Sequence, residues 1–122
     1  MALTLTPATG SVLDQILRDT YPIWGGGLSL DGYTNFQVGQ RRTVWGGTHI
    51  ERVALLDGSR LLASAKRYDL TARVDGRIRR VLGIGAVFTT RELRGRGAAS
   101  ALIAHLVDAA NTDGYELSLI HI

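Results

Sequence analysis

Residues 81–111 read VLGIGAVFTTRELRGRGAASALIAHLVDAAN, and this stretch decides the fold. An apolar, strand-like run, Val81–Thr89, leads into a loop rich in glycine and arginine, Arg94–Ala99, and then into a helical pattern that extends to Asn111. Backbone N–H groups at a helix start have no partner within the helix, and the helix dipole favours negative charge there. Gly95 and Gly97 let the main chain approach a ligand closely. The junction therefore predicts a loop that binds a pyrophosphate.

The helix after the loop is marked by an apolar stripe. Residues at three- and four-residue spacing share one helix face, as do Ala99, Leu102, Ile103, Leu106, Ala109 and Ala110. Asp113-Gly114 ends the helix, because glycine readily adopts the left-handed conformation found just past a helix end. We interpret the stripe as core packing and His105 as a surface histidine.

Three strand-like segments lead up to the loop. They lie at His49–Leu56, Arg60–Val74 and Arg77–Thr89, and Asp-Gly pairs at residues 57–58 and 75–76 separate them. Such pairs favour the primed turns of β-hairpins, in which the central residues have positive φ. The segments therefore predict a three-strand antiparallel meander.

The last of these strands contains two glycines on one side. Strict alternation places Gly83 and Gly85 on the same face as Val81, Val87 and Thr89, which clears much of that face of side chains. A cleared face indicates either a ligand or a tightly packed helix. Both interpretations remain open at this point.

In the middle strand, the apolar residues change from odd-numbered to even-numbered positions. Leu61, Ala63 and Ala65 alternate on one parity, whereas Tyr68 and Leu70 take the other. The change predicts a one-residue bulge near residues 66–67, which would restore a single core face.

The loop and its setting resemble the acetyl-CoA-binding motif of the GNAT acetyltransferases, Gln/Arg-x-x-Gly-x-Gly/Ala. Arg94, Gly97 and Ala99 fill its three fixed positions. Taken alone, the six-residue loop favours the interpretation as a solvated turn before a helix. The order of meander, loop and helix adds to the resemblance, because it is the order of the second to fourth strands and third helix of that family. The resemblance implies an α+β fold: a GNAT-type mixed, mostly antiparallel sheet flanked by helices, within one domain over residues 1–122.

The resemblance also implies a function and a set of binding residues. The expected activity is acetyl-CoA-dependent N-acetyl transfer to a primary amine of a small molecule or a protein, with acetyl-CoA as co-substrate. The alternative is a CoA-binding or interaction module without turnover. On the family pattern, strand backbone binds the pantetheine and the loop binds the pyrophosphate; the residues concerned are Val87, Phe88, Thr89, Arg94, Gly95, Arg96, Gly97, Ala98, Ala99 and Ser100.

No catalytic residue is assigned from the sequence. A protonated amine must lose its proton before it attacks a thioester. By position, the bases to consider are His49 and Glu51, expected on one side of the second strand, and Glu92 beside the loop. An exposed strand face explains the first two equally well.

The N-terminal third carries a short predicted helix and several aromatic residues. Ser11–Thr20 predicts a helix with Ser11 as its cap and Pro22 beyond its end. In the family, the segment after the first helix lines the acceptor cleft. Substrate contact and packing on the core are therefore both open for the aromatic residues there, namely Tyr21, Trp24, Tyr33, Phe36 and Trp45.

The composition narrows the classes of function. The 122 residues contain no cysteine, so disulfides and thiolate nucleophiles are excluded, and no metal site is predicted. No apolar run approaches the ~20 residues of a membrane span, and we expect a cytoplasmic protein without membrane contact. Thirteen arginines stand against one lysine within a net charge of +3. They are interleaved with acids, so no nucleic-acid partner is expected, whereas an oligomer remains open.

The C-terminal segment raises a separate expectation. A full GNAT domain continues past its fifth strand with a further helix and two strands. Residues 117–122, LSLIHI, also match the translation of a transposon adapter used in sequencing libraries. We therefore expect a domain whose C-terminal part is incomplete, with residues 117–122 as an adapter artefact. The alternative is a genuine closing strand.

Overall fold

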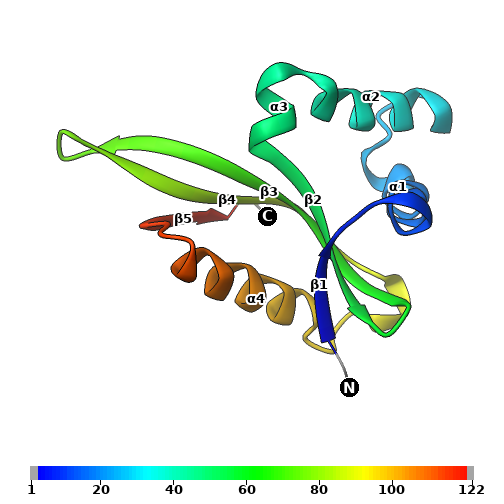
Figure 1. Cartoon of the computed structure of the whole chain (residues 1–122). Coiled ribbons are helices and arrows are strands. Elements are labelled where there is room, and N and C mark those ends of the chain that lie inside the picture. Colours follow the sequence, from blue (N-terminus) through cyan, green and yellow to red (C-terminus); the bar gives the residue numbers. More distant parts are fainter. Residues whose placement is uncertain (1–2, 121–122) are drawn as a thin grey trace.

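The computed structural model describes residues 3–120, which form one five-stranded sheet with helices on both faces (Figure 1). The strands lie in chain order across the sheet: β1 (Leu3–Pro7), β2 (Ile50–Asp57), β3 (Arg60–Val74), β4 (Arg77–Thr89) and β5 (Leu117–Ile120). All neighbours are antiparallel except β4 and β5, which are parallel. The helices are α1 (Gly10–Trp24), α2 (Leu30–Arg42), α3 (Val44–His49), the 3-10 turn η1 (Arg91–Leu93) and α4 (Ala98–Thr112). The expected α+β, mostly antiparallel sheet is confirmed.

The two predicted hairpins are present, with different turns. In the β3–β4 turn, Asp75 and Gly76 both have positive φ, at 51° and 76°, which is the pattern of a type I′ turn. In the β2–β3 turn, Asp57 pairs with Arg60, so the central residues are Gly58 and Ser59, and only Gly58 has positive φ. The first Asp-Gly pair thus places its aspartate in the strand, and the turn follows the II′ pattern.

The prediction of a bulge near residues 66–67 of β3 is wrong about its position. There β3 pairs regularly with β2. The extra residue of β3 is Leu62, because Leu55 pairs with Ala63 while Leu56 pairs with Leu61. A second bulge lies in β4, because Ser64 pairs with Phe88 while Lys66 pairs with Gly85, and Ala86 takes a φ of 51°. A bulge inserts one residue into one strand and reverses the facing of all later side chains on that strand.

The β4 bulge corrects the predicted face of that strand. Alternation holds as far as Gly85, but Val87 then packs into the core beneath α4. Next to the glycines of this face lie side chains of the neighbouring strand β3. A Cβ built on Gly83 would lie 2.9 Å from Leu70 Cδ1 and 3.0 Å from Tyr68 Cβ, so side chains of β3 occupy the space. Ala63 and Ala65 of β3 therefore face α4, whereas Leu61, on the other side of the Leu62 bulge, packs on the α1 face.

The core is split between the two faces of the sheet, as Figure 1 shows with α4 on one side and α1, α2 and α3 on the other. The buried part of the predicted α4 stripe, Leu102, Leu106 and Ala110, packs against β2, β3 and β4. On the other face, Ile16 of α1 packs against Ala54 and Leu61. Gly114 has a φ of 87° just past α4, which confirms the predicted helix end.

The structure extends the first helix beyond its prediction. Pro22 lies inside α1, and Thr9 rather than Ser11 occupies the N-cap position. A proline in the last turn removes a single helical hydrogen bond. The helix continues to Trp24, whose ring stacks edge-on against Phe88 with 6.4 Å between centroids. The contact brings the end of α1 to the end of β4.

The C-terminal strand, β5, is an exposed edge strand of the sheet. Leu117–Ile120 pair with Val81–Ile84, and all four residues of β5 are exposed. Residues 121–122 lie outside the described part of the chain, so the prediction about the origin of residues 117–122 stays a prediction. Within residues 3–120, no helix is both long and apolar enough to cross a membrane.

Candidate functional site

The glycine loop holds the start of α4 open to solvent. Gly95 and Gly97 both have a φ of 80°, a conformation that only glycine adopts at low cost. Gly97 is the N-cap of α4, and no side chain of residues 3–120 bonds to the first N–H groups of the helix. A Cβ on either glycine would meet no atom within 4 Å. The glycines are therefore required by backbone conformation, and the open N–H groups of residues 98–100 form a surface that suits a phosphate.

Arg94 is positioned between the loop and the end of β4. Its Nε donates to the carbonyl oxygen of Thr89 at 3.3 Å, and its guanidinium lies 5.6 Å from the centre of the Phe88 ring. Arg94 and Arg96 are exposed, so both charges are available to an anion at the start of α4. The Thr89 carbonyl, expected to serve the pantetheine, is engaged by Arg94 in this structure.

The end of β4 lies beyond its pairing with β5. The β4–β5 ladder covers Val81–Ile84 only, and the bulge at Ala86 follows directly. On this side, β4 from Gly85 to Thr89 has no strand partner among residues 3–120. The end of β4 at Val87 and Phe88 therefore has an open edge on the β5 side, although Phe88 pairs with Ser64 of β3 on the other side. The resemblance places the pantetheine arm at this open edge.

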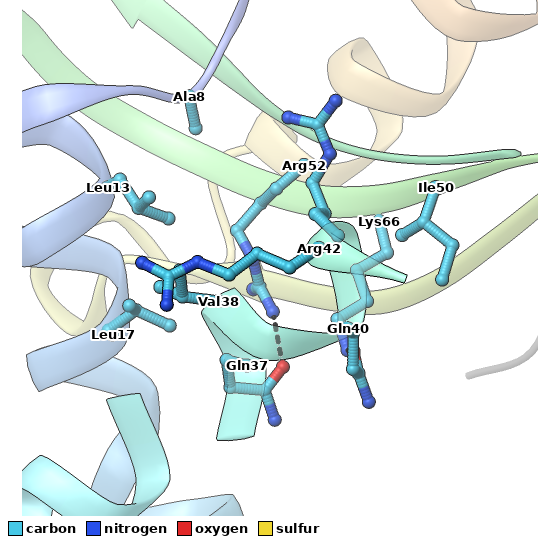
Figure 2. A pocket seen from close by; sticks show the side chains of 11 residues that line it. Ala8, Leu13, Leu17, Gln37, Val38, Gln40, Arg42, Ile50, Arg52 and Lys66 are labelled. Atoms are coloured by element: carbon cyan, nitrogen blue, oxygen red, sulfur yellow. Dashed lines mark hydrogen bonds between the residues drawn. The ribbon is translucent and has the colours of Figure 1, made fainter. Parts of the chain in front are cut away.

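Two adjoining cavities lie on the opposite face of the sheet from α4. The larger, of about 360 Å³, is enclosed by α1, α2, β2 and β3, and Figure 2 shows its lining. The smaller, of about 290 Å³, shares Gln37, Arg52 and Lys66 with it and reaches Ala86 and Val87. The cavities therefore lead from the helical layer to the β4 bulge.

Arg52 and Lys66 are the charged groups shared by both cavities. They are partners in the β2–β3 register and point from the sheet toward the amides of α2 (Figure 2). Arg52 Nη2 donates to Gln37 Oε1 at 3.0 Å, and Lys66 Nζ donates to Gln40 Oε1 at 2.8 Å. Burial, followed by the charge of Arg52, lowers the pKa of Lys66 to about 8. Burial also lowers the pKa of Arg52, against the opposing influence of nearby tyrosines.

Sequence reasoning did not find Arg52 or Lys66. The neighbours of each residue along its strand point to the other face of the sheet. A charged residue in an antiparallel strand is expected to lie on the face that points to solvent. The signal that was available is that Lys66 is the single lysine of the chain.

The pKa of Lys66 predicts a pH-dependent stability. The folded chain holds this proton less tightly than the unfolded chain, in which lysine has its usual pKa of 10.5. Between pH 8 and 10.5 the unfolded state therefore binds more protons, and the free energy of unfolding rises with pH. The gain is about 1–2 kcal/mol after allowance for the solvent screening of a half-buried ammonium. Urea unfolding of wild type and Lys66→Gln across this range measures it, and the variant should lack the rise.

An equal rise in both proteins would contradict this lowered pKa. The other ionisable groups are present in both chains, so their contributions cancel in the comparison.

The bases considered from sequence do not reach these cavities. His49 is the last residue of α3, where its ring stacks on Trp45 at 4.6 Å and Nδ1 lies 2.8 Å from the Trp45 carbonyl oxygen. Glu51 faces the other side of the sheet and pairs with Arg67 at 2.8 Å. His49 and Glu51 do share a polar hollow with Asp69 and Tyr115, but no residue of β4 lines it. Glu92 is exposed in η1.

The aromatic residues of the N-terminal third divide between the two expected roles. Trp24 and Tyr33 line the smaller cavity. Tyr33 is also buried in the core, where its hydroxyl lies 2.8 Å from Thr20 Oγ1, and Tyr21 packs against its ring. Phe36 and Trp45 are exposed, and neither lines these two cavities. Trp24 is thus the one exposed aromatic residue of this group at the cavity wall.

Known proteins similar to this chain share its fold. The acetyltransferase (GNAT) domain family matches residues 37–121. A transcriptional regulator from Bacillus halodurans is 16% identical, with a TM-score of 0.75 over 99% of this chain and 82% of that one. An aminoglycoside N-acetyltransferase in complex with CoA is 15% identical, with a TM-score of 0.72 over 99% and 77%. A Trypanosoma brucei acetyltransferase is 22% identical, with a TM-score of 0.69 over 99% and 83%. No curated protein matches the chain at a significant level.

Proposed function

Because the chain belongs to the acetyltransferase (GNAT) domain family, we propose that it transfers the acetyl group of acetyl-CoA to a primary amine. One observation carries the proposal: the β4 bulge lies between the open glycine loop and the cavities of the opposite face. A donor bound along the loop and β4 and an acceptor bound in the cavities would meet at Ala86–Val87.

The donor side rests on backbone groups. The N–H groups of residues 98–100 would bind the pyrophosphate, with Arg94 and Arg96 adding charge. The end of β4 around Val87 and Phe88, which has no β5 partner, would hold the pantetheine in an extended form. The loop fits this use, because no atom of the described chain fills the space beside Gly95 and Gly97. CoA complexes of a similar fold support this assignment.

The chemistry follows from positioning and charge stabilisation. The free amine attacks the thioester carbonyl carbon, the C–N bond forms, the C–S bond breaks, and the amine proton leaves while the thiolate of CoA is protonated. A backbone N–H freed by the bulge near Val87 would donate to the carbonyl oxygen as negative charge develops on it. No imidazole or carboxylate among residues 3–120 lines the two cavities, so the proton would leave through water.

The test is release of the CoA thiol in the presence of a panel of amines. The proposal predicts amine-dependent thiol release, with the acetylated amine found by mass spectrometry in equal amount. Binding of acetyl-CoA without thiol release by any amine would favour the alternative, a CoA-binding module without turnover. Absence of acetyl-CoA binding would contradict both.

A further inference from the structure

The charges that line the two cavities are all positive. Within the described part of the chain, no aspartate or glutamate lines either cavity. The charged lining residues are Arg41, Arg42, Arg52 and Lys66. A polycationic acceptor would enter this space against repulsion, whereas an anionic group would be attracted.

Arg52 carries an unused hydrogen-bond donor buried in the wall of this space. The residue is 7% exposed, and its Nη1 is buried without a partner in residues 3–120. The ion pairs found in the described chain use other arginines, namely Arg67, Arg79 and Arg80. Buried charges are nearly always paired, because removing a charge from water without compensation costs several kcal/mol. The guanidinium therefore has the features of a site that an anion completes.

Lys66 places a second positive charge beside the first. Arg52 and Lys66 are direct partners across the β2–β3 ladder, and like charges so placed repel each other. Their neighbours in α2 are the neutral amides of Gln37 and Gln40, which accept hydrogen bonds without compensating the charge. An anion between the two side chains would relieve the repulsion and use the free guanidinium nitrogen.

The cavity also has an apolar wall that can bind an organic group. Figure 2 shows Leu13 and Leu17 of α1 and Val38 of α2 together on the side of the cavity away from Lys66. The volumes of about 360 and 290 Å³ suit a small molecule rather than a large one. The anchoring charges are thus shared by two adjoining cavities, one with the apolar wall and the other with the β4 bulge.

Resting on the proposed function, we propose that the amine acceptor carries a carboxylate, and that Arg52 and Lys66 bind this carboxylate. The planar guanidinium suits the two oxygens of a carboxylate, and the ammonium supplies a second contact. The acceptor's amine then extends past Trp24 toward Ala86 and Val87. Arg52 and Lys66 act in this account as residues that determine acceptor specificity.

Paired acceptors test the inference. Each α-amino acid of a panel is compared with its own carboxamide, and neamine serves as a polycationic acceptor. We expect kcat/KM to favour the acid over the amide by about tenfold or more, as for loss of a charge-assisted hydrogen bond. The amine of the carboxamide has the lower pKa, so a larger fraction of it is free to react. A preference for the acid therefore cannot arise from the fraction of free amine.

Variants assign the preference to the cavity. Arg52→Gln should reduce the acid-to-amide ratio about tenfold, and Lys66→Gln should reduce it less. Arg73→Gln removes the same charge from an exposed position of β3 and should leave the ratio unchanged. Arg52→Gln should also melt at a higher temperature than wild type, because it removes an unpaired buried charge. If Arg52→Gln fails to fold, Arg52→Lys takes its place. Lysine keeps the positive charge but lacks the planar guanidinium with its paired N–H donors, so the acid-to-amide ratio should fall in part.

A binding measurement separates this inference from the proposed function. Isothermal titration with N-acetyl amino acids and with their carboxamides needs no turnover. Tighter binding of the acids, lost in Arg52→Gln, supports the inference even if no amine releases thiol. Equal or better use of amides or neamine, or an acid preference that survives in Arg52→Gln, would overturn it while leaving acetyl transfer itself intact.

Discussion

Replacing Gly97 with valine should weaken acetyl-CoA binding more than tenfold. Gly97 has a φ of 80°, which a β-branched residue adopts only at a cost of about 1–3 kcal/mol. Because the space beside Gly97 is open, the cost arises from the backbone rather than from a clash. We expect the loop to relax to negative φ and to turn the N–H groups at the start of α4 away from the pyrophosphate. Isothermal titration with acetyl-CoA measures the change in affinity.

Ser100→Ala is the matched control for Gly97→Val. It lies in the same first turn of α4 and keeps its backbone N–H, so its affinity should stay close to that of wild type. If Gly97→Val kept its affinity for acetyl-CoA and melted at the same temperature as wild type, the loop would not be part of the acetyl-CoA site.

A single methyl group on Gly46 should destabilise the helical layer severely. A Cβ built there would lie 1.8 Å from the carbonyl oxygen of Gln40 and 2.7 Å from Thr43 Oγ1, so the turn between α2 and α3 must open. We expect a loss of about 3 kcal/mol or more in the free energy of unfolding. Gln37 and Gln40 lie on α2 and bond to the cavity cations, so the acceptor cavity should be lost with the turn.

Gly39→Ala is the matched control in α2. A Cβ on Gly39 would meet no atom within 4 Å, and alanine favours the helix over glycine by up to about 1 kcal/mol. Urea unfolding of the two variants should therefore give changes of opposite sign. A Gly46→Ala protein as stable as wild type would show that α2 and α3 are not joined as described.

The parts of the fold that local pattern specifies were predicted from the sequence. Both hairpins and α4 are bounded by glycine or Asp-Gly signals within a few residues of their ends, and they form as expected. In contrast, β1, α2 and α3 were not predicted. The sequence of β1 is short, and its strand state depends on pairing with β2, about fifty residues away. Such an element is fixed by tertiary contact rather than by local preference.

The candidate site also has parts that local sequence predicts and parts that depend on tertiary contacts. The glycine loop carries its own signal, because two residues with positive φ at a helix start require glycine. The β4 bulge does not, since Ala86 takes positive φ although alanine rarely does. The bulge also decides which face Val87 joins, so the predicted alternation failed from that residue onward. Arg52 and Lys66 come together only through the β2–β3 register, which a single strand sequence does not reveal.

The most direct test of the central claim is to locate acetyl-CoA on the chain by its effect on backbone amide resonances. Two-dimensional ¹⁵N–¹H spectra recorded during titration with acetyl-CoA report each N–H group separately. The account predicts that the largest shifts occur at residues 95–100 and 86–89, with small shifts in the hollow around His49 and Glu51. Absence of shifts at residues 95–100, or shifts concentrated in that hollow, would contradict it.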